Sequence, residues 1–284
     1  MGRVPLSVRS SADQSEEYTA LRDGVPEWML ASATSWTKQF FFDDHGWGRA
    51  ASIERAEQYL RLKLEWTGSS DLNRASSAGK QLLALVADEV VGLDLIDFCL
   101  STCYRSDSRP KRLQGILDRS ASAWSVGLDD EDKFCLERRV DAAVEAAARV
   151  EMAEGSKAAA YLSSAWHLVY GRAPSPSSAY REAVRAIEAS ARPTVTPRDA
   201  LATLGKMIAA MNDAPAKWVA VIGDIDTVRL MMTAVWRAQH DRHGTDDESK
   251  PANVSAGEAE AAVQYAVAQI HLFRTGAIRL ADST

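Results

Sequence analysis

The sequence has few cysteines, no long apolar run and no glycine-rich phosphate loop. Its three cysteines, Cys99, Cys103 and Cys135, give neither a disulfide framework nor a zinc-ligand spacing. Cys99 and Cys103 lie one helical turn apart beside apolar residues, so we expect buried free thiols. No apolar run approaches the roughly 20 residues of a membrane span, and the N-terminal residues 1–17 lack the apolar segment of a secretory signal peptide. We therefore expect a cytoplasmic chain with no membrane contact.

Common catalytic motifs are also missing. The sequence contains no serine-centred elbow, no phosphate-binding glycine motif and no zinc spacing. Asp43, Asp44 and His45 in FFFDDHGWGR could ligate a metal, but no second acidic or histidine cluster completes the site. We interpret this stretch as core aromatic residues flanking a loop, and we expect neither a metal nor a cofactor.

The charge of the chain is modest and uneven. The net charge of −6 argues against a broad surface that coats nucleic acid. Residues 1–154 contain 19 Lys and Arg against 26 Asp and Glu, which is a net charge of −7. Residues 155–284 contain 14 against 13, which is a net charge of +1. We therefore expect any contact with a polyanion to be local and to lie in the second part.

Helical periodicity extends along most of the chain and strand signals are scarce, which predicts an all-α protein with no sheet. The stretch QLLALVADEVVGLDLIDFCL is apolar almost all round and predicts a central helix of the N-terminal half. SRPKR at 108–112 predicts a loop. GLDDEDKF predicts the start of a further helix, with acidic residues at its positive end, that continues to residue 155.

The second half predicts five helices separated by turns. They correspond to SKAAAYLSSAWHLVYG, SSAYREAVRAIEASAR, VTPRDALATLGKMIAAM, GDIDTVRLMMTAVWRAQ and SAGEAEAAVQYAVAQIHLF. The second of these is expected to end before Pro193. The last begins with Ser255 and Glu258 at the spacing of a capping box, followed by one apolar stripe. The periodicity and the charge shift place a boundary within 145–160, between an N-terminal helical domain (1–150) and a C-terminal one (151–284).

The stretch WRAQHDRHGT, residues 236–245, carries the chemistry that the rest of the chain lacks. In a regular helix Arg237 and His243 would point about 120° apart. Unwinding after Gln239, with the freedom that Gly244 gives the chain, can bring the two side chains together. A guanidinium binds phosphate oxygens through two donors, and an imidazole exchanges a proton near neutral pH. A basic group in the last turn of a helix is, however, also favoured by the helix dipole without any catalytic role.

Three segments together resemble the HEPN superfamily, and within it the C-terminal domain of abortive-infection-type bacterial proteins. They are the proline-led helix SPSSAYREAVRAIEASAR, the stretch WRAQHDRHGT, and the terminal helix SAGEAEAAVQYAVAQIHLF. HEPN nucleases have an Arg, four to six residues and then a His at the junction of a helix and a loop, as Arg237 and His243 do here. The resemblance covers roughly residues 155–275. Ala238 departs from it, since nuclease members usually have a small polar residue after the arginine.

The resemblance implies a HEPN-like helical bundle and metal-independent cleavage of RNA by Arg237 and His243, commonly with two such helices paired across a homodimer. Arg242 directly precedes His243, so either arginine could be the functional one. His240 could orient Arg237 or contact substrate, or it could be an ordinary surface histidine. Glu188 falls where related domains often have an acidic residue facing the motif, or it could pair with Arg185 or Arg192. The helix with Met231, Met232, Val235 and Trp236 is expected to supply the apolar surface of the dimer.

Two functions follow for the second half. The first is an endoribonuclease of a bacterial anti-phage (abortive infection) or toxin-like system, with RNA as its partner. The second is a HEPN-like module without catalysis that binds proteins or nucleotides. In the first case the acidic N-terminal half is expected to sense or restrain, and a phage or regulatory protein is a possible partner of the chain. A nucleic-acid-binding regulator is the third reading, and the acidic pI of about 5.5 argues against it.

Overall fold

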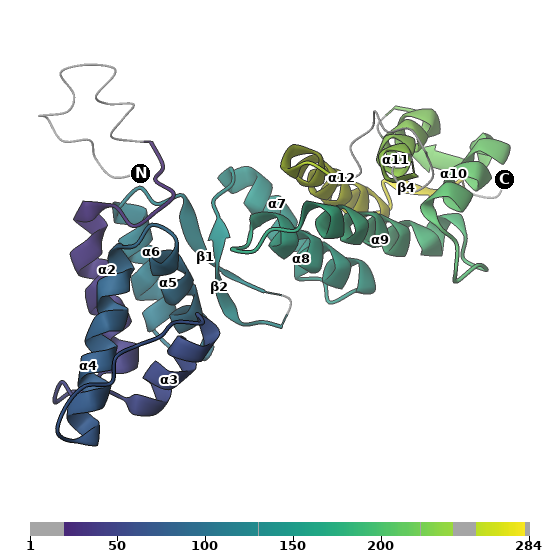
Figure 1. The fold of residues 1–284 in the computed structure, drawn as a ribbon. Coiled ribbons are helices and arrows are strands. Elements are labelled where there is room, and N and C mark those ends of the chain that lie inside the picture. Colours follow the sequence, from purple (N-terminus) through teal and green to yellow (C-terminus); the bar gives the residue numbers. More distant parts are fainter. Residues whose placement is uncertain (1–19, 130, 222, 241–253, 282–284) are drawn as a thin grey trace, which may run out of the picture. The chain divides into compact units, whose positions relative to one another are not determined.

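The computed structural model describes residues 20–129, 131–221, 223–240 and 254–281. The chain divides into two compact units, residues 1–139 and 140–284, and each has its own hydrophobic core. Most of the described residues are helical, as expected (Figure 1). Among them, no helix is both long and apolar enough to cross a membrane. The division falls ahead of the predicted 145–160 because the first helix of the second unit packs with that unit's own helices.

The first unit consists of helices around an apolar core and a short hairpin. Its elements are α2 (Glu27–Phe41), α3 (Ala50–Tyr59), α4 (Asp71–Ala84), η1 (Leu85–Ala87), α5 (Val91–Ser101), α6 (Arg109–Arg119), β1 (Trp124–Leu128) and β2 (Phe134–Arg138). Trp36 and Phe41 of α2 are fully or almost fully buried in the core. Phe40 and Phe42 are buried as well, and Asp43 accepts hydrogen bonds from the backbone of His45 and Trp47. The interpretation of this stretch as core aromatics beside a loop is therefore confirmed for the three phenylalanines, whereas Trp47 is 42% exposed.

The antiparallel hairpin β1–β2 corrects the prediction of a helix starting at GLDDEDKF. Trp124 pairs with Arg138 and Leu128 with Phe134. The acidic residues do not begin a helix. Instead Asp129 accepts hydrogen bonds from the backbone N–H groups of Glu131 and Lys133 and so stabilises the turn. The helix that follows starts only at Ala142, where the Asp141 side chain accepts from the Ala143 backbone N–H.

The predicted central helix of the N-terminal half is also corrected, because it is divided into α4, η1 and α5. Asp88 accepts hydrogen bonds from the backbone N–H groups of Val90 and Val91 and so stabilises the turn after which α5 begins at Val91, in the middle of the apolar stretch. These bonds lower the pKa of the Asp88 carboxyl. A Cβ at position 92 would lie 2.5 Å from the Val86 carbonyl oxygen, so only glycine permits this close turn.

Two further helix boundaries, each near a proline, differ from the sequence prediction. SRPKR was predicted as a loop, but α6 starts at Arg109 with Pro110 in its first turn, where the missing N–H costs nothing. The helix expected to end before Pro193 continues to Val195. Val195 is buried in the core of the second unit, which holds this last turn in place.

The five helices predicted for the second half are all present in the second unit, preceded by a sixth. The elements are α7 (Ala142–Met152), α8 (Lys157–Tyr170), α9 (Pro176–Val195), α10 (Leu204–Asp213), η2 (Pro215–Lys217), β3 (Trp218–Ala220), α11 (Ile225–His240), α12 (Ala256–Arg274) and β4 (Ile278–Leu280). β3 and β4 form a second two-stranded antiparallel sheet. The prediction that the protein has no sheet is therefore wrong in detail, although both described sheets are only two strands wide.

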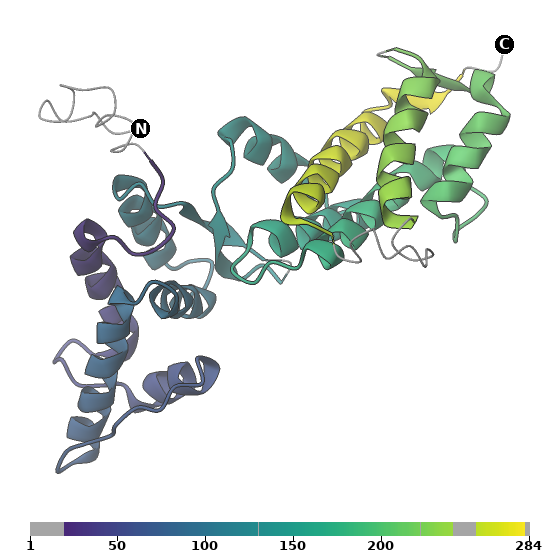
Figure 2. The ribbon, with the colours of Figure 1, turned by 45° about the horizontal axis from the view of Figure 1, so that its top comes forward.

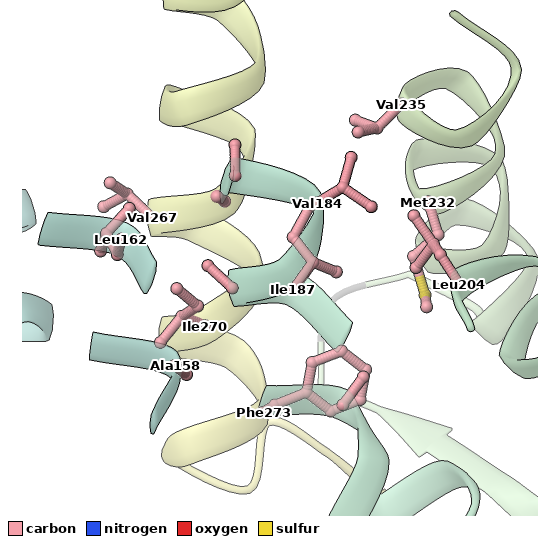
Figure 3. Packing of buried hydrophobic residues seen from close by; sticks show 14 of the residues in the cluster. Ala158, Leu162, Val184, Ile187, Leu204, Met232, Val235, Val267, Ile270 and Phe273 are labelled. Carbon is pink, nitrogen blue, oxygen red and sulfur yellow. The ribbon is translucent and has the colours of Figure 1, made fainter. Parts of the chain in front are cut away.

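Helix α9 is the centre of the second unit. It packs against α8 and α12 along its length and also contacts α10 and α11 (Figures 1 and 2). Figure 3 shows Val184 and Ile187 of α9 between the side chains of α8 and α12 on one side and those of α10 and α11 on the other. The core therefore holds α10 and α11 against the helix that carries Glu188.

The last helix confirms both features predicted for it. All six residues of the expected stripe are buried: Ala259, Val263, Ala266, Val267, Ile270 and Phe273. The capping box is complete, because Ser255 Oγ accepts from the Glu258 N–H (3.3 Å) and the Glu258 carboxylate accepts from the Ser255 N–H (2.9 Å).

Replacing Ser255 by Ala is expected to destabilise the second unit by about 1 kcal/mol, the typical effect of losing an N-cap side chain. Urea unfolding followed by circular dichroism measures the change. Ser255→Asn should recover most of the loss, because asparagine can accept the same hydrogen bond. Equal destabilisation by the two substitutions would contradict a capping role.

Candidate functional site

Helix α11 carries the arginine of the Arg–His motif in its last turns. The Arg237 side chain is exposed. The helix continues to His240, one residue beyond the expected point of unwinding after Gln239. Asp241, Arg242 and His243 lie outside the described residues, and so does the side chain of His240. The pairing of Arg237 with His243 therefore stays a prediction.

The turn before Arg237 is fixed by contacts with two other helices. Tyr180 of α9 donates a hydrogen bond from its buried hydroxyl to the Val235 carbonyl oxygen (2.7 Å). Trp236 packs on the first turn of α10, where a Cβ at position 205 would lie 3.0 Å from the indole nitrogen. A larger residue than Gly205 would push the ring away. Arg237 therefore projects from a turn whose position is set by α9 and α10.

The surface predicted for a dimer needs correction. Met232 and Val235 are buried in the core of the second unit (0% and 3% exposed), where they pack with α9 and α10. They cannot also form an apolar surface that two copies share. The prediction is wrong for these two residues, because an apolar helix face looks the same in sequence whether it packs in its own domain or against a partner. Met231 and Trp236 are half-buried. On α11 the large apolar side chain that is exposed is Leu230. The dimer itself stays a prediction.

Glu188 lies in a cleft of about 280 Å³ within the second unit. The cleft is formed by the start of α8, one face of α9 and the segment before α10. Its lining residues are Lys157, Tyr161, Arg185, Glu188, Arg192, Ala200, Leu201, Ala202 and Thr203. The Glu188 carboxylate accepts a hydrogen bond from the Leu204 N–H (2.7 Å), the first residue of α10. Glu188 therefore caps α10.

The alternative expected for Glu188 was an ion pair with Arg185 or Arg192. Within the described ranges neither arginine forms one with Glu188. Arg185 pairs instead with the buried Glu182 (3.1 Å), and Arg192 donates to the Ala202 carbonyl oxygen (3.1 Å). The Nε of Arg192 is buried and has no acceptor among the residues that the structure describes. The two arginines therefore keep part of their hydrogen-bonding capacity.

The surroundings of the cleft are net positive. Lys157 Nζ and the Arg185 guanidinium each lie 5.8 Å from the centre of the Tyr161 ring. In and around the cleft, five cations face three carboxylates: Lys157, Arg181, Arg185, Arg192 and Lys206 against Glu182, Glu188 and Asp199. Lys157 forms no ion pair with any residue in the described part of the chain. This local excess of +2 lies in the half of the sequence where we expected contact with a polyanion.

The cleft and the motif are connected through the first turn of α10. Glu188 binds the backbone of Leu204, and the next residue, Gly205, contacts Trp236, the neighbour of Arg237. The structure therefore brings Glu188 to the same helix start that supports the motif-bearing turn of α11. Sequence reasoning selected Glu188 and named Arg192 as its possible ion-pair partner, but it missed Lys157 and Tyr161, which lie on α8 and have no sequence spacing in common with the α9 residues.

A second polar cluster in this unit was missed entirely. The Glu151 carboxylate at the end of α7 is buried (1% exposed) and accepts from Arg274 Nε (2.8 Å), Arg274 Nη2 (2.8 Å) and His271 Nδ1 (2.7 Å). Arg274 also pairs with Glu154 (3.3 Å). Hydrogen bonds from Arg274, then those from His271, hold the pKa of the Glu151 carboxyl below its usual value, although burial acts in the opposite direction.

We interpret the Glu151 cluster as structural. A buried carboxylate with two donors from one arginine fastens α7 to the last turn of α12, and it leaves no open position beside the carboxylate for a substrate. The signal in the sequence was weak: His271 and Arg274 lie one helical turn apart in the last helix, with 120 and 123 positions separating them from Glu151. The exposed arginine of α11 and the cationic cleft remain the better candidates for function. In comparisons with known proteins, no family model, curated protein or solved structure matches the chain.

Proposed function

We propose that the chain is a metal-independent endoribonuclease of a bacterial anti-phage (abortive infection) or toxin-like system. One observation supports this function above the others. An exposed arginine lies at the end of a firmly packed helix, directly before the segment with His243, and the same helix start that supports it also borders a cationic cleft. RNA can contact both the Arg–His motif and the cationic cleft, because it presents phosphates at close intervals beside 2′-hydroxyl groups.

In the proposed reaction His243 acts as the base and Arg237 as the electrostatic partner. The His243 imidazole takes the proton from the 2′-hydroxyl, and the 2′-oxygen attacks the adjacent phosphorus. The bond from phosphorus to the 5′-oxygen of the next nucleotide breaks, that oxygen takes up a proton from water, and the His243 imidazolium returns its proton to water. Arg237 stabilises the negative charge that develops on the phosphate oxygens. The products are a 2′,3′-cyclic phosphate and a 5′-hydroxyl end.

The cleft serves this reaction by holding a neighbouring phosphate of the strand. Lys157 and Arg185 flank the Tyr161 ring, so a phosphate there meets two cations and a nucleobase meets an aromatic side chain. Glu188 does not contact RNA in this proposal. It holds the first turn of α10, and with it the ring of Trp236, in position. A homodimer would place two Arg–His motifs together.

Purified full-length chain incubated with RNA in the presence of EDTA tests the proposal. Arg237→Ala should slow cleavage by about 10²–10³-fold, as expected for loss of one group that stabilises developing charge. Arg229→Ala on the same helix is the matched control, since Arg229 pairs with Asp226, and it should cleave at the wild-type rate. If wild-type chain binds RNA without cleaving it, the alternative of a module without catalysis replaces this proposal.

A further inference from the structure

The first unit contains a groove that the proposed nuclease reaction does not use. It has a volume of about 510 Å³ and lies between α2 and α6. The lining residues are Ala31, Ser32, Ser35, Trp36, Lys111, Arg112, Gly115, Ile116 and Arg119. The volume is in the usual range for small-ligand sites.

The charge of the groove is opposite to that of its surroundings. The first unit, residues 1–139, contains 18 Lys and Arg against 22 Asp and Glu and is net −4, yet the groove is lined by Lys111, Arg112 and Arg119 and by no acidic residue among those described. These three cations form no ion pair anywhere in the part of the chain that the structure covers. Arg112 donates one hydrogen bond to the neutral Gln39 side chain (2.9 Å).

Two arginines near the groove, in contrast, form ion pairs within this unit. Arg109, at the start of the same helix, pairs with Asp107 and lies 4.0 Å from the centre of the Phe40 ring. Arg139 pairs with Asp118 (2.6 Å). Carboxylates are thus plentiful near α6, but they are bound to cations outside the groove. These carboxylates therefore do not neutralise the positive charge of the groove, which is available to an anionic ligand.

The shape of the groove suits an anion with more than one charged group. Lys111 and Arg119 are eight residues apart on α6, but the Arg119 guanidinium folds back over Gly115, which is about one helical turn from Lys111. Ser32 and Ser35, one turn apart on α2, supply hydroxyl groups from the opposite wall. Gly115 leaves room for the Arg119 guanidinium, since a Cβ there would lie 3.1 Å from Arg119 Nη1. Cations along one wall and hydroxyls along the other match adjacent phosphate groups.

We propose that this groove binds a small ligand of nucleotide size that carries at least two phosphate groups. Arg112 and Lys111 bind one phosphate, the Arg119 guanidinium beside Gly115 binds the adjacent one, and the serines donate to the phosphate oxygens. The size of the groove favours such a ligand over a long nucleic-acid strand, because the row of cations ends after about one helical turn. The inference concerns the first unit alone and does not depend on the proposed nuclease.

Isothermal titration of the full-length chain with ADP, inorganic pyrophosphate and a single-stranded 12-nucleotide DNA tests the proposal. Wild-type protein should bind ADP, and pyrophosphate should compete with it. The double substitution Lys111→Gln and Arg119→Gln should weaken ADP binding roughly tenfold or more, the effect of losing charged hydrogen bonds to phosphate. Ser35→Glu, which adds a carboxylate to the groove, should weaken it as well.

The control is Lys80→Gln, which removes an exposed cation of α4 outside the groove and should change the ADP affinity by less than about twofold, as a distant screened charge does. Melting curves verify that each variant is folded. The proposal is overturned if wild-type chain does not bind ADP or if the groove variants bind it as tightly as wild type. Groove-dependent binding of the oligonucleotide without binding of ADP or pyrophosphate would also overturn it, in favour of a strand-binding surface.

Discussion

Replacing His243 by Ala is expected to reduce RNA cleavage by about 10²–10⁴-fold, the usual contribution of a general base. The same substitution should leave the free energy of unfolding within about 1 kcal/mol of wild type, because a polar residue of a loop sequence contributes no core packing. Rates on a labelled RNA and urea unfolding curves measure the two effects. In cells, expression of the intact chain should slow bacterial growth, and the His243→Ala form should not.

Two further substitutions distinguish the roles of the residues in the motif. Arg242→Ala should reduce cleavage much less than Arg237→Ala if Arg237 is the functional arginine, and the order is reversed if Arg242 is. His240→Ala should have a small effect, since His240 is expected at most to orient Arg237 or contact substrate. Cleavage by His243→Ala at the wild-type rate would show that the base lies elsewhere.

Arg274→Ala is expected to be the most destabilising single substitution considered. It leaves the Glu151 carboxylate, 1% exposed, with His271 as its one remaining side-chain donor among the described residues. Removing one partner of an ion pair leaves the buried charge of the other without compensation. The loss is moderated because Arg274 is itself one-third exposed and partly screened by water. Urea unfolding at neutral pH measures the loss.

The double substitution Glu151→Ala and Arg274→Ala is the control, and it should be less destabilising than Arg274→Ala alone because no unpaired carboxylate remains buried. The pKa of Glu151 is lowered in the folded chain, mainly by Arg274. Its stabilising contribution is therefore present above the unfolded pKa of about 4.5 and is lost as the pH falls through the folded value. If Arg274→Ala matched wild type in stability, the cluster would not fasten α7 to α12.

Features of the fold that depend on local sequence could be predicted. The capping box of Ser255 and Glu258 satisfies backbone groups within one turn, and the stripe of α12 follows from helical periodicity alone. The hairpin β1–β2 could not be predicted this way. Its strands are short, and β2 is held partly by α5, where the Asp97 side chain accepts from the Leu136 N–H (2.6 Å). The acidic turn between the strands has the composition of a helix start.

The candidate site likewise has one part that the sequence predicts and another that only the fold brings together. Arg237 could be selected because it belongs to a compact motif at a helix end. The cleft could not, since Lys157 lies at the start of α8, Arg192 near the end of α9 and Ala202 before α10. Only the packing of these helices brings the side chains together. Glu188 was selected by resemblance, and its hydrogen bond to Leu204 shows a positioning contact that no sequence pattern contained.

The chemical ends of cleaved RNA test the proposed function most directly. Full-length chain, a defined RNA and EDTA in excess should give products with 2′,3′-cyclic phosphate and 5′-hydroxyl ends, identified by mass spectrometry. A matched RNA with a single 2′-deoxy nucleotide at the cleavage position should remain intact. Products with 3′-hydroxyl ends that form only when a divalent metal is added, or an RNA left uncut under all conditions, would contradict metal-independent attack by the 2′-hydroxyl.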